Sequence, residues 1–406
     1  LHSRLRTLYP LLMLNIYNAC LTYSYSPQEW KESRVILLPK PNKPPHLPSS
    51  YRPICINSIL GKVLEKLVYN RVYHFLHINN LLHPRQFGFT HKTSAPAALV
   101  QVKNIINSQI SAQKKAIIIS LDITNAFNTL WTPFILEYLK RHNLPRNLYL
   151  LLQTLLTDRT IIYLTQSAPV SFQATLGSPQ GSPLSPLLWN ILISSLLDIT
   201  FPANVHIQAF ADDITLIISG KTRLQIETTA NKTLQMIHTW STQHHIQFNP
   251  SKSNFILIGK HYLKRPPTIK LGTHNIRHTH ELKILGVIFD HKLSFLPHTT
   301  YLRNKIYQHT IALSSFSGIH WGFSPKHFRD LYTRSLERII TYGAPVFFSS
   351  TPHSHLMRKL ISIQRIPLLK ICKAFSTVSN ASINILTNIL PIEHTLNREI
   401  ALFHLF

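Results

Sequence analysis

Two adjacent aspartates, Asp212 and Asp213, lie between two short β-prone runs, 206–211 and 214–218, in a chain that has only 16 acidic residues. Because two residues separate the runs, we expect a tight hairpin with both carboxylates in its turn. Like charges side by side repel unless a cation neutralises them. Mg²⁺ is commonly held by one or two carboxylates together with substrate phosphates. The pair therefore predicts a magnesium site.

A third carboxylate, Asp122, directly follows the continuous apolar run 116–121. Such a run is typical of a buried strand, so Asp122 is expected at the end of that strand. Three carboxylates that hold two divalent ions about 4 Å apart suit in-line phosphoryl transfer. Taken alone, the aspartate pair is more typical of an ordinary turn than of a metal site, because Asp is common in turns.

Helical and β-prone segments must position these residues. Apolar residues at helical spacing predict helices, and short β-branched runs predict strands. The expected helices are 1–25, 59–79, 95–112, 132–157, 187–197, 222–243 and most of the chain beyond 300. The expected strands are 34–38, 116–121, 160–165, 171–174, 206–211, 214–218, 254–258 and 284–289, with loops at 39–53 and 177–186. Helices between non-adjacent strands predict a mixed α+β fold.

The charge balance is strongly basic, with 42 Lys and Arg against 16 Asp and Glu and a formal net charge of +26. The imbalance comes from a shortage of acids, since charged residues are 14% of the chain and a typical protein has about 25%. A surface that binds nucleic acid is one explanation. A coding bias that also depletes glycine, of which there are 11, is the other.

Several other classes are excluded. The hydrophobic content of 44% rules out a disordered tail. The only cysteines, Cys20, Cys55 and Cys372, are too far apart for a disulfide framework or a zinc motif. No apolar run reaches the roughly 18 residues of a membrane span, so no membrane partner is expected.

The aspartates belong to an ordered series of motifs. These are 34–41 (RVILLPKP), 50–54 (SYRPI), 86–89 (QFGF), 120–127 (SLDITNAF), 177–188 (GSPQGSPLSPLL), 210–213 (FADD), 249–252 (NPSK) and 285–290 (LGVIFD). In this order, and through nearly the whole chain, the series resembles the reverse transcriptase of non-LTR (LINE-type) retrotransposons, especially the insect jockey, R1 and I-like groups.

The resemblance implies an α+β right-hand polymerase. An N-terminal helical extension would occupy 1–24 and the fingers 25–115. The palm, with its catalytic β-hairpin, would occupy 116–290 and contain an interleaved fingers segment at about 131–176. A helical thumb and connection would occupy 291–406.

The resemblance also implies roles for nine residues. Asp122, Asp212 and Asp213 would be the catalytic metal ligands for two Mg²⁺ ions, with Mn²⁺ as a substitute. The nucleotide-binding residues would be Lys40, Arg52, Phe127, Gln180, Gly181 and Lys252.

Each nucleotide-binding residue has an expected task under the resemblance. Arg52 and Lys40 would contact the triphosphate, although Lys40 is also compatible with a solvated loop charge. Phe127 would be a steric gate against the ribose 2′-hydroxyl. Gln180 and Gly181 would lie along the nascent base pair. Lys252 would act either as a general acid for pyrophosphate or as an electrostatic clamp on it.

The implied activity is RNA-directed DNA polymerisation, in which dNTPs are added to the 3′-hydroxyl of a DNA primer on an RNA template. Two alternatives remain. A catalytically inactive, nucleic-acid-binding relic fits the acid depletion, including Asn128 where the family usually has an acid. An RNA-dependent RNA polymerase is the other, and Phe127 argues against it.

The resemblance extends to partners and place of action. The chain begins with Leu and reads as a fragment of a longer polyprotein. Its other domains would include an endonuclease that supplies the nick. A nuclear location with a cytoplasmic ribonucleoprotein stage is expected from the family alone.

Overall fold

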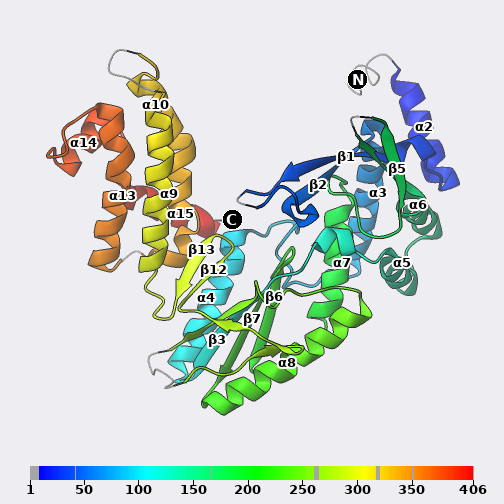
Figure 1. Cartoon of the computed structure of the whole chain (residues 1–406), viewed down its shortest axis with the longest axis horizontal. Helices are drawn as coiled ribbons and strands as arrows, with labels where there is room; N and C mark the ends of the chain where they lie inside the picture. The colour runs from blue at the N-terminus through cyan, green and yellow to red at the C-terminus, as the bar shows by residue number, and fades with distance from the viewer. Residues whose placement is uncertain are drawn as a thin grey trace.

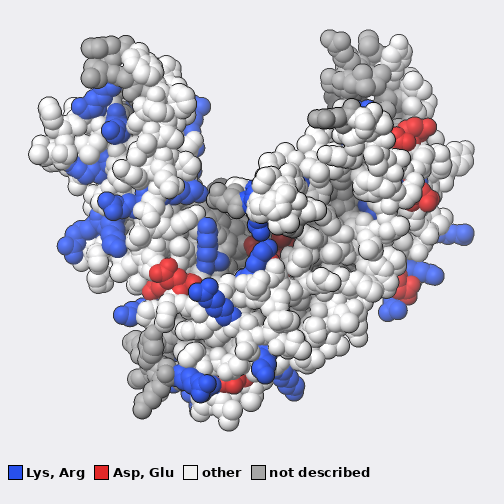
Figure 2. All heavy atoms as spheres, viewed as in Figure 1, with Lys and Arg blue, Asp and Glu red and all other residues white. Residues whose placement is uncertain are grey.

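The computed structural model describes residues 9–41, 43–165, 167–259, 265–316, 321–349 and 352–405. Within them the mixed α+β class is confirmed. A five-stranded sheet lies at the base of the molecule, and two lobes rise from it (Figure 1). In the space-filling view the surface between the lobes is hollowed, and Lys and Arg side chains border the hollow (Figure 2).

The five-stranded sheet has the order β11-β8-β3-β7-β6. Its strands are β3 Lys115–Leu121, β6 Val205–Phe210, β7 Asp213–Gly220, β8 Asn254–Ile258 and β11 Arg277–His278. Ile117 and Ile119 of β3 pack in one core with α7 (Ser185–Leu197) and α8 (Arg223–Gln243), whereas Ile118 packs in a second core with α4 (Ala95–Ser111). Both faces are covered, which explains the unbroken apolar run of β3.

A four-stranded sheet in the N-terminal lobe has the order β2-β1-β4-β5. Its strands are β1 Glu32–Pro39, β2 Tyr51–Asn57, β4 Arg159–Leu164 and β5 Pro169–Ala174. β1 pairs with β2 antiparallel and with β4 parallel, so segments more than 100 residues apart share one sheet. The loop expected at 39–53 is shorter than predicted, because β2 begins at Tyr51.

Helices complete this lobe. They are α2 Pro10–Tyr23, α3 Ile59–Ile78, α5 Thr132–Arg141 and α6 Arg146–Leu156, with 3-10 turns at Gln28–Trp30, Pro48–Ser50 and Ala126–Thr129. The single helix expected at 132–157 is wrong. Asn143 has a φ of +59°, and Pro145 disfavours a helical conformation at Leu144, so the chain breaks between α5 and α6. Of the helix expected at 1–25, residues 1–8 lie outside the described residues.

The C-terminal lobe is helical, as predicted. Its helices are α9 Leu296–Ser314, α10 Pro325–Leu331, α11 Glu337–Thr341, α12 Ala344–Phe347, α13 Ser354–Cys372, α14 Asn380–Thr387 and α15 Ile392–Leu405, with a π-helical turn at Tyr332–Leu336. The Asp290 carboxylate accepts hydrogen bonds from the amides of Lys292, Ser294 and Phe295, and this network fixes the turn before α9.

Two short hairpins follow β8 in the chain, and the second of them connects the sheet to this lobe. They are formed by β9 Lys270–Leu271 with β10 His274–Asn275, and by β12 Glu281–Ile284 with β13 Val287–Asp290. The strand expected at 284–289 is interrupted, because Leu285 and Gly286 both have positive φ and form the turn between β12 and β13. Across the described ranges, no helix combines the length and apolar character needed to cross a bilayer.

Candidate active site

The β6–β7 hairpin carries the aspartate pair, but its turn differs from the prediction by one residue. Phe210 pairs with Asp213, so Ala211 and Asp212 form the turn and Asp213 begins β7. Ala211 has a φ of +57°, which is uncommon for a residue other than glycine. Asp212 is therefore at the tip of the hairpin, and Asp213 is at the end of a strand.

Asp122 follows β3 and is positioned by a second loop. Its carbonyl accepts a hydrogen bond from the Asn249 amide at 2.8 Å, and its own amide donates to Ser253 Oγ at 3.2 Å. The side chain of Asn249 accepts hydrogen bonds from the amides of Ser251 and Lys252. This turn brings Lys252 Nζ to 3.4 Å from Asp122 Oδ2.

The three carboxylates interact electrostatically. The pKa of Asp213 is raised from 3.8 to about 6, first because the surrounding protein displaces water and then because Asp212 and Asp122 carry like charge. Asp122 Oδ2 is buried and accepts no hydrogen bond from the described residues, although Lys252 Nζ is its ion-pair partner. A cation placed between the three carboxylates would relieve their repulsion.

The same residues do not form a complete metal cage by themselves. Across the described part of the chain, no three His, Cys, Asp or Glu side chains are gathered closely enough to hold an ion. Mg²⁺ retains several waters and usually takes one or two carboxylates plus substrate phosphates. The carboxylates therefore fit an ion whose coordination a bound nucleotide completes.

Asp213→Asn should stabilise the metal-free protein at neutral pH. Because the pKa of Asp213 is raised on folding, the folded state binds the proton more tightly than the unfolded chain does. Ionisation therefore costs stability as the pH rises from about 4 to 6. We expect a gain of about 1 kcal/mol at pH 7.5, a value reduced for solvent screening because Asp213 is exposed at the surface.

Thermal unfolding in EDTA, from pH 4 to pH 8, measures this effect. The difference in Tm between variant and wild type should shrink as the pH falls toward 4. A difference that stays constant across this range would contradict the proposed repulsion.

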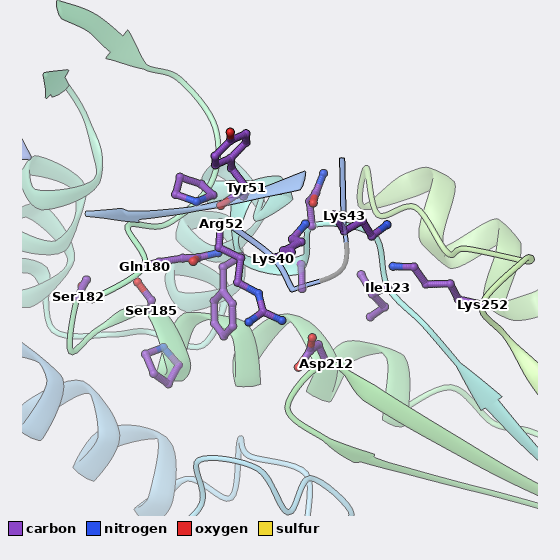
Figure 3. Close-up of a pocket in the computed structure, with 17 residues that line it drawn as sticks. Lys40, Lys43, Tyr51, Arg52, Ile123, Gln180, Ser182, Ser185, Asp212 and Lys252 are labelled. Atoms are coloured by element: carbon purple, nitrogen blue, oxygen red, sulfur yellow. The ribbon is translucent and has the colours of Figure 1, made fainter. Parts of the chain in front are cut away.

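One cavity of about 570 Å³ brings most of the predicted site together (Figure 3). Seven of the nine predicted residues line it, namely Lys40, Arg52, Phe127, Gln180, Gly181, Asp212 and Lys252. The other two are adjacent: Asp122 contacts Lys252, and Asp213 follows Asp212 in the chain. The cavity thus joins the hairpin tip, the β1–β2 loop and the loop before α7.

The β1–β2 loop and strand β2 supply three of the four described Lys and Arg residues that line the cavity, and Lys252 is the fourth. The amide of Lys40 donates to the Ser50 carbonyl at 2.7 Å and closes the loop. The Arg52 side chain extends from β2 toward Asp212 (Figure 3). Lys43 also lines the cavity, although no site role was predicted for it. Cations facing a carboxylate across a cavity can bind phosphates beside a divalent ion.

Phe127 and the 177–188 loop form another wall. Phe127 lies in the 3-10 turn Ala126–Thr129, and its half-buried ring contacts Trp189 with 5.5 Å between centroids. The Cys55 amide of β2 donates to the Gln180 carbonyl at 3.0 Å, so this loop is tied to the four-stranded sheet.

Gly181 is required for a reason that the motif did not reveal. Its φ is +121°, and a Cβ at this position would lie 2.8 Å from the Cys55 carbonyl oxygen. The contact that demands glycine is therefore with the backbone of β2. Trp189 and Gln86 were also given no task, although both contact the hairpin turn.

Comparisons with known proteins agree with the motif series. A family model described as reverse transcriptase (RNA-dependent DNA polymerase) matches residues 38–289. The retrovirus-related Pol polyprotein from type-1 retrotransposable element R1 of Bradysia coprophila is 32% identical over 385 residues, which are 94% of this chain and 38% of the relative. The RNA-directed DNA polymerase from mobile element jockey of Drosophila melanogaster is 27% identical over 344 residues, 82% of this chain and 37% of the relative.

The chain thus spans less than two-fifths of the length of these curated relatives. Among solved structures, apo telomerase from Candida tropicalis aligns over 97% of this chain and 71% of its own, with a TM-score of 0.47 and 12% identity.

Proposed function

This chain belongs to the reverse transcriptase family, and from that premise we propose that it is an RNA-directed DNA polymerase that adds dNTPs to a primer 3′-hydroxyl. The observation that carries the proposal is the single cavity in which Asp212, at the hairpin tip, faces Arg52 and Lys252. Membership of the family implies an RNA template and a primer, and the cavity contains side chains suited to binding a metal-bound triphosphate.

The metal site would use Asp122, Asp212 and Asp213. When bound there, two Mg²⁺ ions, or Mn²⁺ in their place, activate the primer hydroxyl and stabilise the charge on pyrophosphate. The chain's own residues hold the reactants: Arg52 and Lys40 bind phosphate oxygens, and Gln180 and Gly181 border the base pair. The ring of Phe127 excludes a 2′-hydroxyl.

The domain assignment is likewise proposed. Residues 25–115 and 131–176 would form the fingers, which is supported by the pairing of β1 with β4. The remainder of 116–290 would form the palm, and 291–406 the thumb and connection. A duplex of template and primer would occupy the basic hollow between the lobes, held mainly through its phosphates (Figure 2).

We propose RNA and DNA primer as the partners, together with further domains of a longer polyprotein, since a relative is named a Pol polyprotein. An endonuclease among those domains would supply the primer end. Action on chromosomal DNA would require the protein to be in the nucleus at that stage.

Primer extension tests the proposed activity. The chain is incubated with poly(rA), oligo(dT), labelled dTTP and Mg²⁺, with EDTA in a parallel reaction. We expect incorporation that requires both the RNA template and the divalent ion. RNA binding without incorporation by folded protein would contradict the proposal and support a non-catalytic relic.

Lys252→Ala should reduce kcat by roughly a hundredfold if Lys252 protonates the leaving pyrophosphate. Lys252 is close to Asp122 and 61% exposed, so its ammonium can reach a ligand in the cavity. Lys252→Arg distinguishes the two roles, because arginine keeps the charge but does not release its proton. A clamp predicts rescue by arginine and a general acid predicts none; single-turnover rates measure both.

A further inference from the structure

Trp189 connects two parts of the site that are far apart in the chain. It lies on the buried helix α7, and its side chain is fully buried. Its ring contacts the Phe127 ring, with 5.5 Å between centroids and 46° between planes. Its indole Nε1–H donates to the Ala211 carbonyl at 3.0 Å, directly before Asp212. One side chain therefore supports the proposed sugar gate and holds the hairpin turn.

The turn needs such support because the backbone of Ala211 adopts the left-handed conformation. A non-glycine residue with positive φ is stable only where its surroundings impose the conformation. Both backbone groups of Ala211 are satisfied by side chains from other elements. Its N–H donates to Gln86 Oε1 at 3.1 Å, and its carbonyl accepts from Trp189. Gln86 Oε1 also accepts a hydrogen bond from the Gly88 amide at 3.0 Å, which fixes the position of this oxygen.

Close packing leaves the turn little freedom to move. A Cβ on Gly88 would lie 2.1 Å from the Ala211 nitrogen, so the 86–89 segment packs directly against the hairpin turn. Gln86 is 2% exposed. If the indole donor were lost, the Ala211 carbonyl would keep its contact with Gln86 Nε2 at 3.5 Å, which is at the limit for a hydrogen bond.

We propose that Trp189 is a positioning residue that fixes the Asp212 turn and the Phe127 gate relative to each other, and so sets both turnover and sugar selectivity. The proposal rests on the proposed polymerase function. Trp189 touches no reactant; its indole N–H acts through Ala211, and its ring acts through Phe127. The two contacts can be removed separately, since Trp189→Phe deletes the donor and keeps an aromatic ring.

Trp240 provides a matched control. It is also buried in the same core, and its Nε1–H donates to Ser195 Oγ at 3.0 Å. Its ring stacks on His244. Trp240→Phe therefore removes an indole hydrogen bond of the same length, although a less buried one, without touching the hairpin turn or Phe127.

Hydrogen–deuterium exchange and primer extension test the proposal on the 406-residue wild-type chain, Trp189→Phe, Trp189→Leu and Trp240→Phe. We expect exchange in peptides covering 205–220 to rise about tenfold in both Trp189 variants and to stay unchanged in Trp240→Phe. Turnover with dTTP should fall roughly tenfold in Trp189→Phe, with near-normal discrimination against rUTP. Trp189→Leu should lose discrimination as well.

The outcomes separate the two proposals. If the exchange of Trp189→Phe matches that of Trp240→Phe, Trp189 does not hold the turn and the inference is overturned. If wild type incorporates no dTTP, the polymerase function fails, while the exchange data still decide whether Trp189 holds the turn. Lost discrimination in Trp240→Phe would show a general packing effect and would also overturn the assignment.

Discussion

Asp212→Asn is expected to lower dTTP incorporation on poly(rA) by at least about a thousandfold, which corresponds to roughly 4 kcal/mol of lost transition-state stabilisation. Asp212 is the one carboxylate among the described residues that line the cavity. Asparagine keeps its size but cannot supply an anionic oxygen to a divalent ion. Binding of the template–primer should not change, because it depends mainly on Lys and Arg contacts with phosphates. Steady-state extension and filter binding measure the two effects.

Two further measurements make the result specific. Asp330→Asn removes an exposed carboxylate of α10 and should leave incorporation intact. This variant controls for a general effect of removing one negative charge. The Tm of Asp212→Asn should equal or exceed that of wild type in EDTA, because one of three repelling carboxylates is gone. Retention of a tenth or more of the activity would remove Asp212 from the proposed metal site.

Local patterns were sufficient to predict the elements that carry the carboxylates. The apolar run before Asp122 reads as a buried strand because α4 covers one face of β3 and α7 and α8 cover the other. The β-prone runs around Asp212 and Asp213 predicted a hairpin, since alternation and spacing report strand pairing directly. The motif series then indicated which residues should meet, and the cavity contains seven of the nine.

Contacts between distant segments decided what the patterns missed. The turn residues are Ala211 and Asp212 because Gln86 and Trp189 stabilise a left-handed Ala211, and neither residue is near it in sequence. Gly181 is needed because β2 approaches it. The break at Asn143 was missed for a different reason: apolar residues continue at helical spacing on both sides of it, so periodicity alone cannot locate it.

Phe127→Ala is expected to raise rUTP incorporation relative to dTTP by about a hundredfold, or on the order of 3 kcal/mol of discrimination. The Phe127 ring borders the cavity, and Trp189 and Phe89 contact it with centroid distances of 5.5 and 6.2 Å. Because these two rings pack against Phe127, its ring cannot move away from a 2′-hydroxyl in the cavity. Alanine opens that space, so kcat/KM for rUTP should rise while that for dTTP falls only a few-fold.

Phe134→Ala separates the gate from a general loosening of the core. Phe134 is half-buried like Phe127, but its ring contacts Tyr138 and His244 rather than a residue of the cavity. Its loss should lower Tm without changing the ratio of kcat/KM for the two nucleotides. The gate would be refuted if Phe127→Ala gave no gain with rUTP, or if Phe134→Ala gave the same gain. The RNA polymerase alternative would then regain support, because Phe127 is the feature that argues against it.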